Sequence, residues 1–221
     1  MTAIVDYRAG NLTSVRYAFD ALGVAADVTR DPAAIRAADR VVFPGVGAAR
    51  HAMESLRELG LVEAVREAAE TKPFLGICLG MQILFDRSEE DGGVDTLGIL
   101  PGQVRRFPHV VGFKVPEIGW NQVEIIELSN KRIIESEETK LAASSPIRLF
   151  DDSIIRKSPA REYYFVHSYY AEICPYTVGV AEYAGVEFTA LVKKGRLWAS
   201  QFHPEKSGRV GLDLIKEWLS C

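Results

Sequence analysis

The chain has 221 residues, of which 48% are hydrophobic and 25% charged, so it can bury a substantial core without disulfides or metals. A formal net charge of −4 excludes the strongly basic field of proteins that bind nucleic acid or anionic membranes. No apolar run approaches the ~20 residues of a membrane span, and three cysteines (Cys78, Cys174 and Cys221) do not suit a disulfide framework, so we expect a cytoplasmic protein.

The first half of the chain alternates apolar runs with amphipathic stretches. Thr13–Leu22 carries apolar residues three or four positions apart and stops at Gly23, which predicts a helix with a C-terminal glycine. Further helices are predicted in two stretches of 48–70 and from residue 79 through Phe85. Predicted strands are Ala3–Val5, Val24–Val28, Val41–Phe43 and Phe74–Ile77. This alternation predicts parallel βαβ units in a doubly wound sheet.

The second half has the pattern of an antiparallel sheet. The pair Ala184-Gly185 and the segment 193–196 have the composition of hairpin turns, and a final helix is predicted at Gly208–Trp218. The predicted strands are Val104–Phe107, Asn121–Ile126, Glu162–Val166, Val178–Glu182, Phe188–Val192 and Leu197–Phe202. Residues 127–161 show little periodicity and predict a surface excursion with room for one short helix. We therefore expect one α/β domain over 1–221, with a doubly wound, mostly parallel sheet flanked by helices and an added antiparallel portion.

The segment 76–80, Gly-Ile-Cys-Leu-Gly, stands directly between a predicted strand and a predicted helix. A nucleophile on so tight a turn is held exposed, and flanking glycines permit the close approach that the turn requires. The first helical turn also directs backbone N–H groups at the sulfur of Cys78, which favours thiolate over thiol. The alternative is a buried cysteine that acts as a small hydrophobe. The glycines on both sides favour the nucleophile.

A cysteine nucleophile needs a base, and the base needs a group that orients it. His203 and Glu205 supply both at the end of a predicted strand, where residues i and i+2 face the same side. We expect Pro204 to hold the backbone extended between them. Taken alone, a histidine near a strand end is more often a structural residue, so the pair gains meaning only together with Cys78.

The loop Pro44–Gly47 follows another predicted strand and is rich in glycine. Acyl transfer generates an oxyanion that needs fixed backbone N–H donors, and the amide of Leu79 next to the nucleophile is one candidate. The glycine-rich loop could present a second. A phosphate loop is disfavoured because no Gly-Lys-Ser/Thr follows, and a simple turn is the remaining alternative.

These segments resemble a known family. GICLGMQ (76–82) and QFHPEKSG (201–208) are similar to the class I, triad-type glutamine amidotransferases. Four further segments resemble the glutaminase subunits of imidazole glycerol phosphate synthases in particular: DYRAGNLTSV (6–15), PGVGA (44–48), GWN (119–121) and YFVHSYY (164–170). The resemblance covers nearly the whole chain and implies the class I glutamine amidotransferase fold.

The resemblance implies a role for each matching residue. Cys78 matches the nucleophile, His203 the general base and acid, and Glu205 the acid that orients the histidine. Residues that match the oxyanion site are Gly45, Val46, Gly47 and Leu79. Residues that match the glutamine pocket are Gln82, Glu90, His167, Ser168 and Tyr169, although without the family Gln82 reads as a polar helix residue and Glu90 as a solvated acid. Residues that match the face toward the synthase partner are Trp120, Tyr164 and Lys206.

The implied reaction is hydrolysis of L-glutamine to glutamate and ammonia, with no cofactor or metal. In this family the ammonia passes to a (β/α)₈-barrel cyclase, forming a heterodimer that makes imidazole glycerol phosphate and an aminoimidazole carboxamide ribotide in histidine biosynthesis. The family's glutaminase is poorly active alone. Ligand on the cyclase promotes a peptide flip at the oxyanion strand, which Gly45 and Gly47 would make inexpensive.

Several positions depart from the family's usual pattern. Arg8 stands where glycine is common, Ala49-Arg50 where an aromatic is usual, and Glu117-Ile118 where His-Met is usual. The last change adjoins Trp120 and bears on the partner face. One alternative is therefore a paralogous glutaminase that feeds another synthase, as in nucleotide-sugar amidation. The alternatives of another class are a non-catalytic module of the same fold and a cysteine hydrolase with other substrates.

Overall fold

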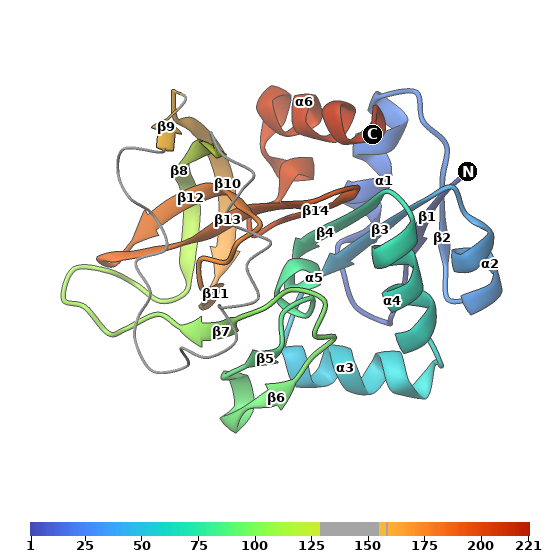
Figure 1. Ribbon diagram of the computed structural model, residues 1–221, viewed down its shortest axis with the longest axis horizontal. Helices are drawn as coiled ribbons and strands as arrows, with labels where there is room; N and C mark the ends of the chain where they lie inside the picture. Colours follow the sequence, from blue (N-terminus) through green and yellow to red (C-terminus); the bar gives the residue numbers. More distant parts are fainter. Residues whose placement is uncertain (129–154, 158) are drawn as a thin grey trace.

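The computed structural model describes residues 1–128, 155–157 and 159–221. Within them, ten strands form one mixed sheet, with helices on both faces of one half (Figure 1). The predicted α/β class is confirmed, although the antiparallel portion is as large as the parallel one.

The parallel half of the sheet has the order β2-β1-β3-β4-β14. Its strands are β1 (Thr2–Val5), β2 (Ala26–Thr29), β3 (Arg40–Gly45), β4 (Phe74–Cys78) and β14 (Leu197–Ser200). All five run in one direction, so their carboxyl ends lie along one edge of the sheet. Ligands of open α/β sheets bind at this edge, which is where the functional residues are expected.

Helices cover the parallel half on both faces because its strands are apolar on both sides. One face packs against α1 (Leu12–Ala21) and α6 (Gly208–Leu219), and the other against α3 (Ala49–Glu58) and α4 (Val62–Thr71). The short helix α2 (Pro32–Ala37) was not predicted; Asp31 caps it, and Pro32 opens it. In the described part of the chain, no helix is both long and apolar enough to cross a membrane.

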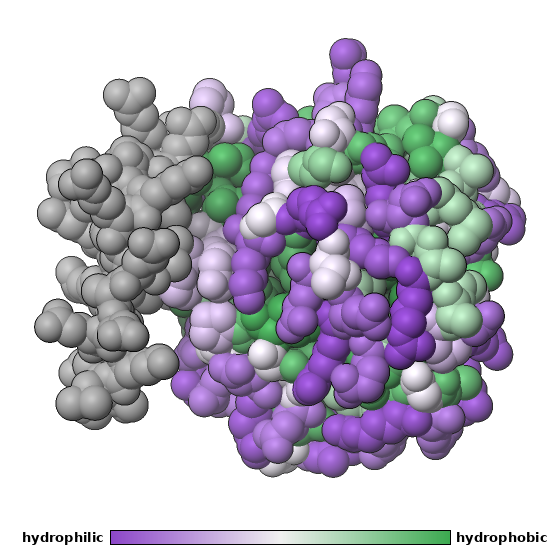
Figure 2. Space-filling model, turned by 45° about the vertical axis from the view of Figure 1, so that its right-hand side comes forward, coloured by the Kyte–Doolittle hydropathy of each residue, from purple (hydrophilic) through white to green (hydrophobic). Residues whose placement is uncertain are grey.

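Alternation along β3 shows how one strand serves both layers. Val42 packs with Phe19 of α1 and Trp218 of α6, whereas Val41 and Phe43 join the cluster under α3 and α4. All five side chains are fully buried. The face seen in Figure 2 is mostly hydrophilic, with hydrophobic residues in small groups, so the large apolar side chains of this half lie between the layers.

The antiparallel half has the order β10-β8-β12-β13-β14, with β9 paired to β8. Its strands are β8 (Glu117–Leu128), β9 (Ile155–Lys157), β10 (Arg161–His167), β12 (Thr177–Tyr183) and β13 (Val186–Lys194). The predicted hairpin is confirmed: Ala184 and Gly185 have φ of 52° and 75°, as a two-residue turn between Tyr183 and Val186 requires.

A second, four-stranded sheet with the order β11-β7-β5-β6 lies beside α3 (Figure 1). Its strands are β5 (Arg87–Ser88), β6 (Val94–Asp95), β7 (Gln103–Arg106) and β11 (Tyr169–Ala171), and a 3₁₀ turn at Glu90–Gly92 joins β5 to β6. Only β7 was predicted, because the other strands are two or three residues long. This sheet and its 3₁₀ turn carry Glu90 and Tyr169, two of the residues predicted for the glutamine pocket.

Two predicted segments differ from the structure. The helix after Cys78 is α5 (Leu79–Gln82), and it tightens into i→i−3 hydrogen bonds at Leu84 and Phe85 rather than continuing. The flanks of the predicted excursion at 127–161 belong to β8 and β9, and its interior, including the short helix, lies outside the described residues.

The contact between α5 and β3 leaves no room for a side chain at Gly80. A Cβ built there would lie 1.9 Å from the carbonyl oxygen of Phe43. We therefore expect Gly80→Ala to push β3 away from the turn after β4 and to lower the free energy of unfolding by about 3 kcal/mol, the upper end of the range for overpacking. Urea unfolding followed by circular dichroism measures this loss.

Gly23→Ala is the matched control. Gly23 has φ +69° but no neighbouring atom within 4 Å of the built Cβ, so alanine there meets only backbone strain, about 1 kcal/mol. Equal losses in the two variants would contradict a steric role for Gly80.

Candidate active site

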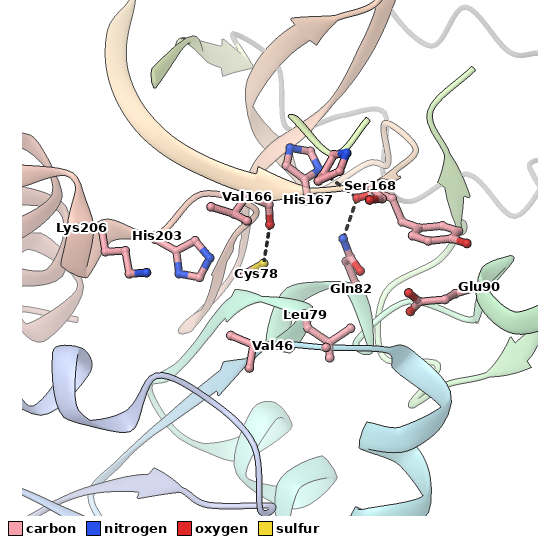
Figure 3. Close-up of a pocket in the computed structure, with 13 residues that line it drawn as sticks. Val46, Cys78, Leu79, Gln82, Glu90, Val166, His167, Ser168, His203 and Lys206 are labelled. Atoms are coloured by element: carbon pink, nitrogen blue, oxygen red, sulfur yellow. Dashed lines mark hydrogen bonds between the residues drawn. The ribbon is translucent and has the colours of Figure 1, made fainter. Parts of the chain in front are cut away.

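Three parallel strands end side by side at the site. Gly45 at the end of β3 pairs with Cys78 at the end of β4, and β14 pairs with the other side of β4. The segments that follow β3, β4 and β14 border a cavity of about 330 Å³ (Figure 3). Its described lining residues are Val46, Gly47, Cys78, Leu79, Gln82, Glu90, Pro116, Val166, His167, Ser168, Tyr169, His203 and Lys206.

Cys78 occupies the strand-to-helix turn in a strained conformation, with φ 55° and ψ −113°. A non-glycine residue there costs ~1–3 kcal/mol, and such strain collects at functional sites. The side chain is 7% exposed and lines the cavity. Its sulfur lies 3.8 Å from the carbonyl oxygen of Val166 and 3.7 Å from Nε2 of Gln201. The predicted elbow is thus present.

His203 and Glu205 lie together as predicted, but for a different structural reason. His203 Nδ1 is 2.8 Å from Glu205 Oε1, and both side chains are almost fully buried. The backbone is not extended between them: Pro204–Lys206 form a 3₁₀ turn, closed by the hydrogen bond from the Lys206 N–H to the His203 carbonyl. Proline is well suited to the first position of such a turn, so the expectation of an extended backbone was wrong.

The charge state of His203 follows from its neighbours. Burial opposes the charged imidazolium, but the negative charge of Cys78, a hydrogen bond with Cys78 and the hydrogen bond with Glu205 outweigh it and raise the pKa of His203 to about 10. At neutral pH the imidazole is therefore protonated and lies beside the Cys78 sulfur. It can give a proton to a leaving group as soon as the sulfur has attacked.

The residues predicted for the oxyanion site lie beside Cys78. Val46, Gly47 and Leu79 line the cavity, whereas Gly45 pairs with Cys78 without lining it. The peptide N–H of Val46 donates to the hydroxyl of Tyr7 at 3.1 Å, and this hydroxyl donates to the Val46 carbonyl at 3.3 Å. The Val46 N–H therefore has a partner within the protein. Tyr7 is a residue that the sequence did not single out.

Tyr7 is itself held firmly. It is fully buried and stacks on Phe43 at a ring-centroid distance of 5.2 Å, and burial raises its pKa far above the ordinary value. The hydroxyl thus stays protonated and can donate and accept at the same time.

All the predicted glutamine-pocket residues line the cavity. Gln82 donates through Nε2 to the Tyr169 carbonyl at 2.7 Å and to Gln201 Oε1 at 2.9 Å. Glu90 accepts the N–H of Ala49 at 2.6 Å at the start of α3, and burial raises the pKa of its carboxyl group. Gln82 and Glu90 are therefore fixed by protein contacts before any substrate binds.

A buried pair beside the pocket was missed in the sequence. His167 Nε2 lies 3.0 Å from Glu117 Oε2, with both side chains almost fully buried, although the contact does not have the geometry of a hydrogen bond. Asn121 donates to the other Glu117 oxygen at 2.8 Å, and His167 Nδ1 lies 2.9 Å from the Tyr169 carbonyl. Glu117 was noted only as a departure near the partner face; only the β8–β10 pairing places it opposite His167.

The residues predicted to face a partner form one surface group. Trp120 is 56% exposed, and its ring meets that of Tyr164 edge-on at 6.1 Å. Lys206 Nζ lies 5.9 Å from the centre of the Tyr164 ring. Lys206 also lines the cavity, so the surface group and the pocket share a side chain.

The pKa of His203 should depend on Cys78 more than on Glu205. In Cys78→Ala, two of the four causes that raise this pKa are removed, and they are the two largest, so we expect it to fall from about 10 towards 6.5. Because the folded-state pKa is raised, the stabilisation it brings is complete below pH 6.5 and is lost as the pH rises through about 10. Titration of the His203 ring by NMR measures the shift.

Cys174→Ala is the control, because Cys174 is also buried but belongs to a different part of the core. Cys174→Ala should not change the pKa of His203. An unchanged His203 pKa in Cys78→Ala would mean that no thiolate faces the ring.

Comparisons with known proteins agree with this geometry. The class-I glutamine amidotransferase family model matches residues 3–219. The imidazole glycerol phosphate synthase subunit HisH of Moorella thermoacetica is 46% identical, over 98% of this chain and 92% of the relative. The same subunit of Desulfovibrio desulfuricans is 45% identical, over 97% and 92%.

Solved structures extend the likeness in fold. A crystal structure of a glutamine amidotransferase superposes with a TM-score of 0.67 at 18% identity, over 99% of this chain and 97% of the other. PurLQS from Thermotoga maritima gives 0.62 at 17% identity, over 99% and 97%. The chain belongs to the class-I glutamine amidotransferases and, within them, to the HisH subunits of imidazole glycerol phosphate synthase.

Proposed function

We propose that the chain is a single glutamine amidotransferase domain that hydrolyses L-glutamine at Cys78 and delivers the ammonia to a cyclase subunit of imidazole glycerol phosphate synthase. The observation that carries this proposal is the arrangement of the Cys78 sulfur, the His203 imidazole and the Glu205 carboxyl group at one cavity. The family model over residues 3–219 supports a single domain. The HisH relatives support the assignment to histidine biosynthesis.

The chemistry follows from the charge states. The Cys78 thiolate attacks the side-chain amide carbon of glutamine, and the electrons of the C=O bond move to the oxygen. As the tetrahedral intermediate collapses, the C–N bond breaks, and His203 gives its proton to the departing nitrogen, which leaves as ammonia. His203, now neutral, takes a proton from water, whose oxygen displaces the sulfur and releases glutamate. Glu205 keeps the proton on Nδ1, so that Nε2 faces the reacting atoms.

The oxyanion requires donors at the Cys78 side of the cavity. The Leu79 N–H is one, directly after the nucleophile, and the loop after β3 supplies the other through the Val46 peptide. The Val46 N–H donates to Tyr7 instead, so the peptide must reorient before it can stabilise an oxyanion. Gly45 precedes this peptide and carries no side chain that would restrict its rotation. The chain alone should therefore be a slow glutaminase.

Ammonia is protonated in bulk water and then no longer attacks carbon, so a protected route to the acceptor is chemically useful. The surface group of Trp120, Tyr164 and Lys206 is the face we assign to the partner, a (β/α)₈-barrel cyclase in a heterodimer. Lys206 joins this face to the cavity. A partner that covers the face would thus sit directly over the place where ammonia forms.

Glutamate release tests the function. We expect slow turnover by the chain alone and strong activation by a barrel cyclase of the same source with its ribotide ligand. Cys78→Ala should lower the activated rate ~10³-fold or more, because the nucleophile is lost. An enzyme-coupled glutamate assay measures both rates.

The two parts of the proposal fail separately in this assay. Turnover that depends on Cys78 but ignores the cyclase would keep the glutaminase and reject the partner, as a paralogue feeding another synthase would. Turnover in neither setting would reject the glutaminase itself, as for a non-catalytic module.

Loss of the Tyr7 hydroxyl should raise the activity of the chain alone. In Tyr7→Phe the N–H and the carbonyl of Val46 both lose their hydrogen bond to the tyrosine hydroxyl, at a cost of about 1–2 kcal/mol, so the catalytic orientation should become about 5- to 30-fold more populated. The measurement is basal glutamate release without the cyclase.

Tyr163→Phe is the matched control. Tyr163 is also buried and stacks on Phe202, with ring centroids 4.0 Å apart. It should not raise basal turnover. A Tyr7→Phe enzyme that is no faster than the parent would show that Tyr7 does not restrain the oxyanion peptide.

A further inference from the structure

The carbonyl oxygen of Tyr169 sets the direction of a buried chain of hydrogen bonds. A carbonyl can only accept, so the atoms that face it must be donors. Two side chains meet it: His167 through Nδ1 at 2.9 Å, and Gln82 through Nε2 at 2.7 Å. The tautomer of His167 and the orientation of the Gln82 amide are therefore both fixed by a backbone atom.

The orientation of the Gln82 amide in turn fixes the orientation of the Gln201 amide. The Gln82 amide nitrogen has two hydrogens, and one is committed to the Tyr169 carbonyl. The same nitrogen lies 2.9 Å from the Gln201 side chain, so the Gln201 atom that faces it must be the acceptor Oε1. This places the Gln201 NH₂ group on the opposite side of its amide, toward the nucleophile.

Gln201 has little freedom to adopt another orientation. Its side chain is fully buried, and its backbone N–H donates to the Ala190 carbonyl at 2.9 Å. Its Nε2 lies 3.7 Å from Cys78 Sγ, within hydrogen-bonding distance for sulfur. Turning the amide over would place two NH₂ groups against each other and a carbonyl oxygen against the sulfur.

We propose that Gln201 is a further catalytic residue, which donates an N–H to the Cys78 sulfur and stabilises its thiolate form, and that Gln82 and the Tyr169 carbonyl orient it for this purpose. The donor is separate from the oxyanion peptides, because it faces the sulfur rather than the substrate oxygen. This inference rests on the proposed function only in taking Cys78 as the nucleophile.

A second group at the same sulfur has the opposite effect on the thiol–thiolate equilibrium. The Val166 carbonyl lies 3.8 Å from Sγ and accepts from the protonated thiol, so it favours the neutral form. An N–H from Gln201 favours the charged form instead. Other charged or titratable groups around Cys78 are His203 with its partner Glu205, Tyr7 from the loop after β1, and Glu90, His167, Tyr169 and Lys206 around the cavity. None of these is altered by a substitution at residue 201.

Cysteine alkylation tests the inference without substrate or partner. In a Cys221→Ser background, which removes the exposed thiol, iodoacetamide labelling of Cys78 is followed by peptide mass spectrometry over a range of pH. Cys174 is buried and serves as an internal reference. In Gln201→Met, a neutral side chain of similar length, we expect labelling at pH 6 to slow about tenfold and the midpoint of the pH profile to rise by about one unit.

Two further variants separate the donor from a packing effect. Gln201→Glu keeps the acceptor for Gln82 but turns an oxygen toward the sulfur, so its midpoint should rise further than that of Gln201→Met. Ser200→Ala removes a buried hydroxyl from the adjacent position, where it donates to the Phe202 carbonyl, and should not move the midpoint. Midpoints in both Gln201 variants equal to that of Ser200→Ala would overturn the inference.

The outcome is independent of glutamine turnover. A raised midpoint in both Gln201 variants, in a chain that releases no glutamate under any condition, would keep the donor and reject the proposed function. Normal glutamine turnover with unchanged midpoints in both Gln201 variants would keep the proposed function and reject Gln201 as a donor. If Gln201→Met does not fold, the Gln201→Glu profile decides alone, because it preserves the size and the bond from Gln82.

Discussion

The structure of the site depends on the close contact between the turn after β4 and the end of β3. Gly80 approaches the Phe43 carbonyl so closely that no side chain fits, and a Cβ on Gly45 would meet the backbone N of Gly80 at 2.6 Å. This contact brings the loop with Val46 against Cys78 and forces the cysteine to a positive φ. Cys78 and the loop with Val46 are therefore parts of one packed unit, and the strain at Cys78 is held by the burial around it.

Features that arise from local chemistry could be predicted from the sequence. The elbow at Cys78, the hairpin turn at Ala184-Gly185 and the closeness of His203 and Glu205 each depend on residues a few positions apart. Even so, the His203–Glu205 contact comes from a 3₁₀ turn rather than from strand alternation, so the right neighbours were predicted for the wrong reason. The second sheet was missed because most of its strands have only two or three residues.

Features that arise from distant pairs could not be predicted. Tyr7 meets Val46 across 39 positions, and Gln201 meets Cys78 across 123. In the sequence Tyr7 is an ordinary aromatic, and Gln201 is only one letter of a motif, because nothing local shows where their polar atoms point. Both contacts follow from the order in which β1, β3, β4 and β14 lie side by side. Strand order is a property of the whole chain.

The buried pair of Glu117 and His167 has a consequence for the exchange of segments between relatives. Glu117 begins β8 and His167 ends β10, and the two positions face each other in the strand register. Removing one member of such a pair leaves an uncompensated charge in the core, whereas exchanging both can be neutral. A chimaera that takes β8 from a protein with a different residue at position 117 therefore gives His167 a new buried partner, and its stability depends on whether that residue can pair with the histidine.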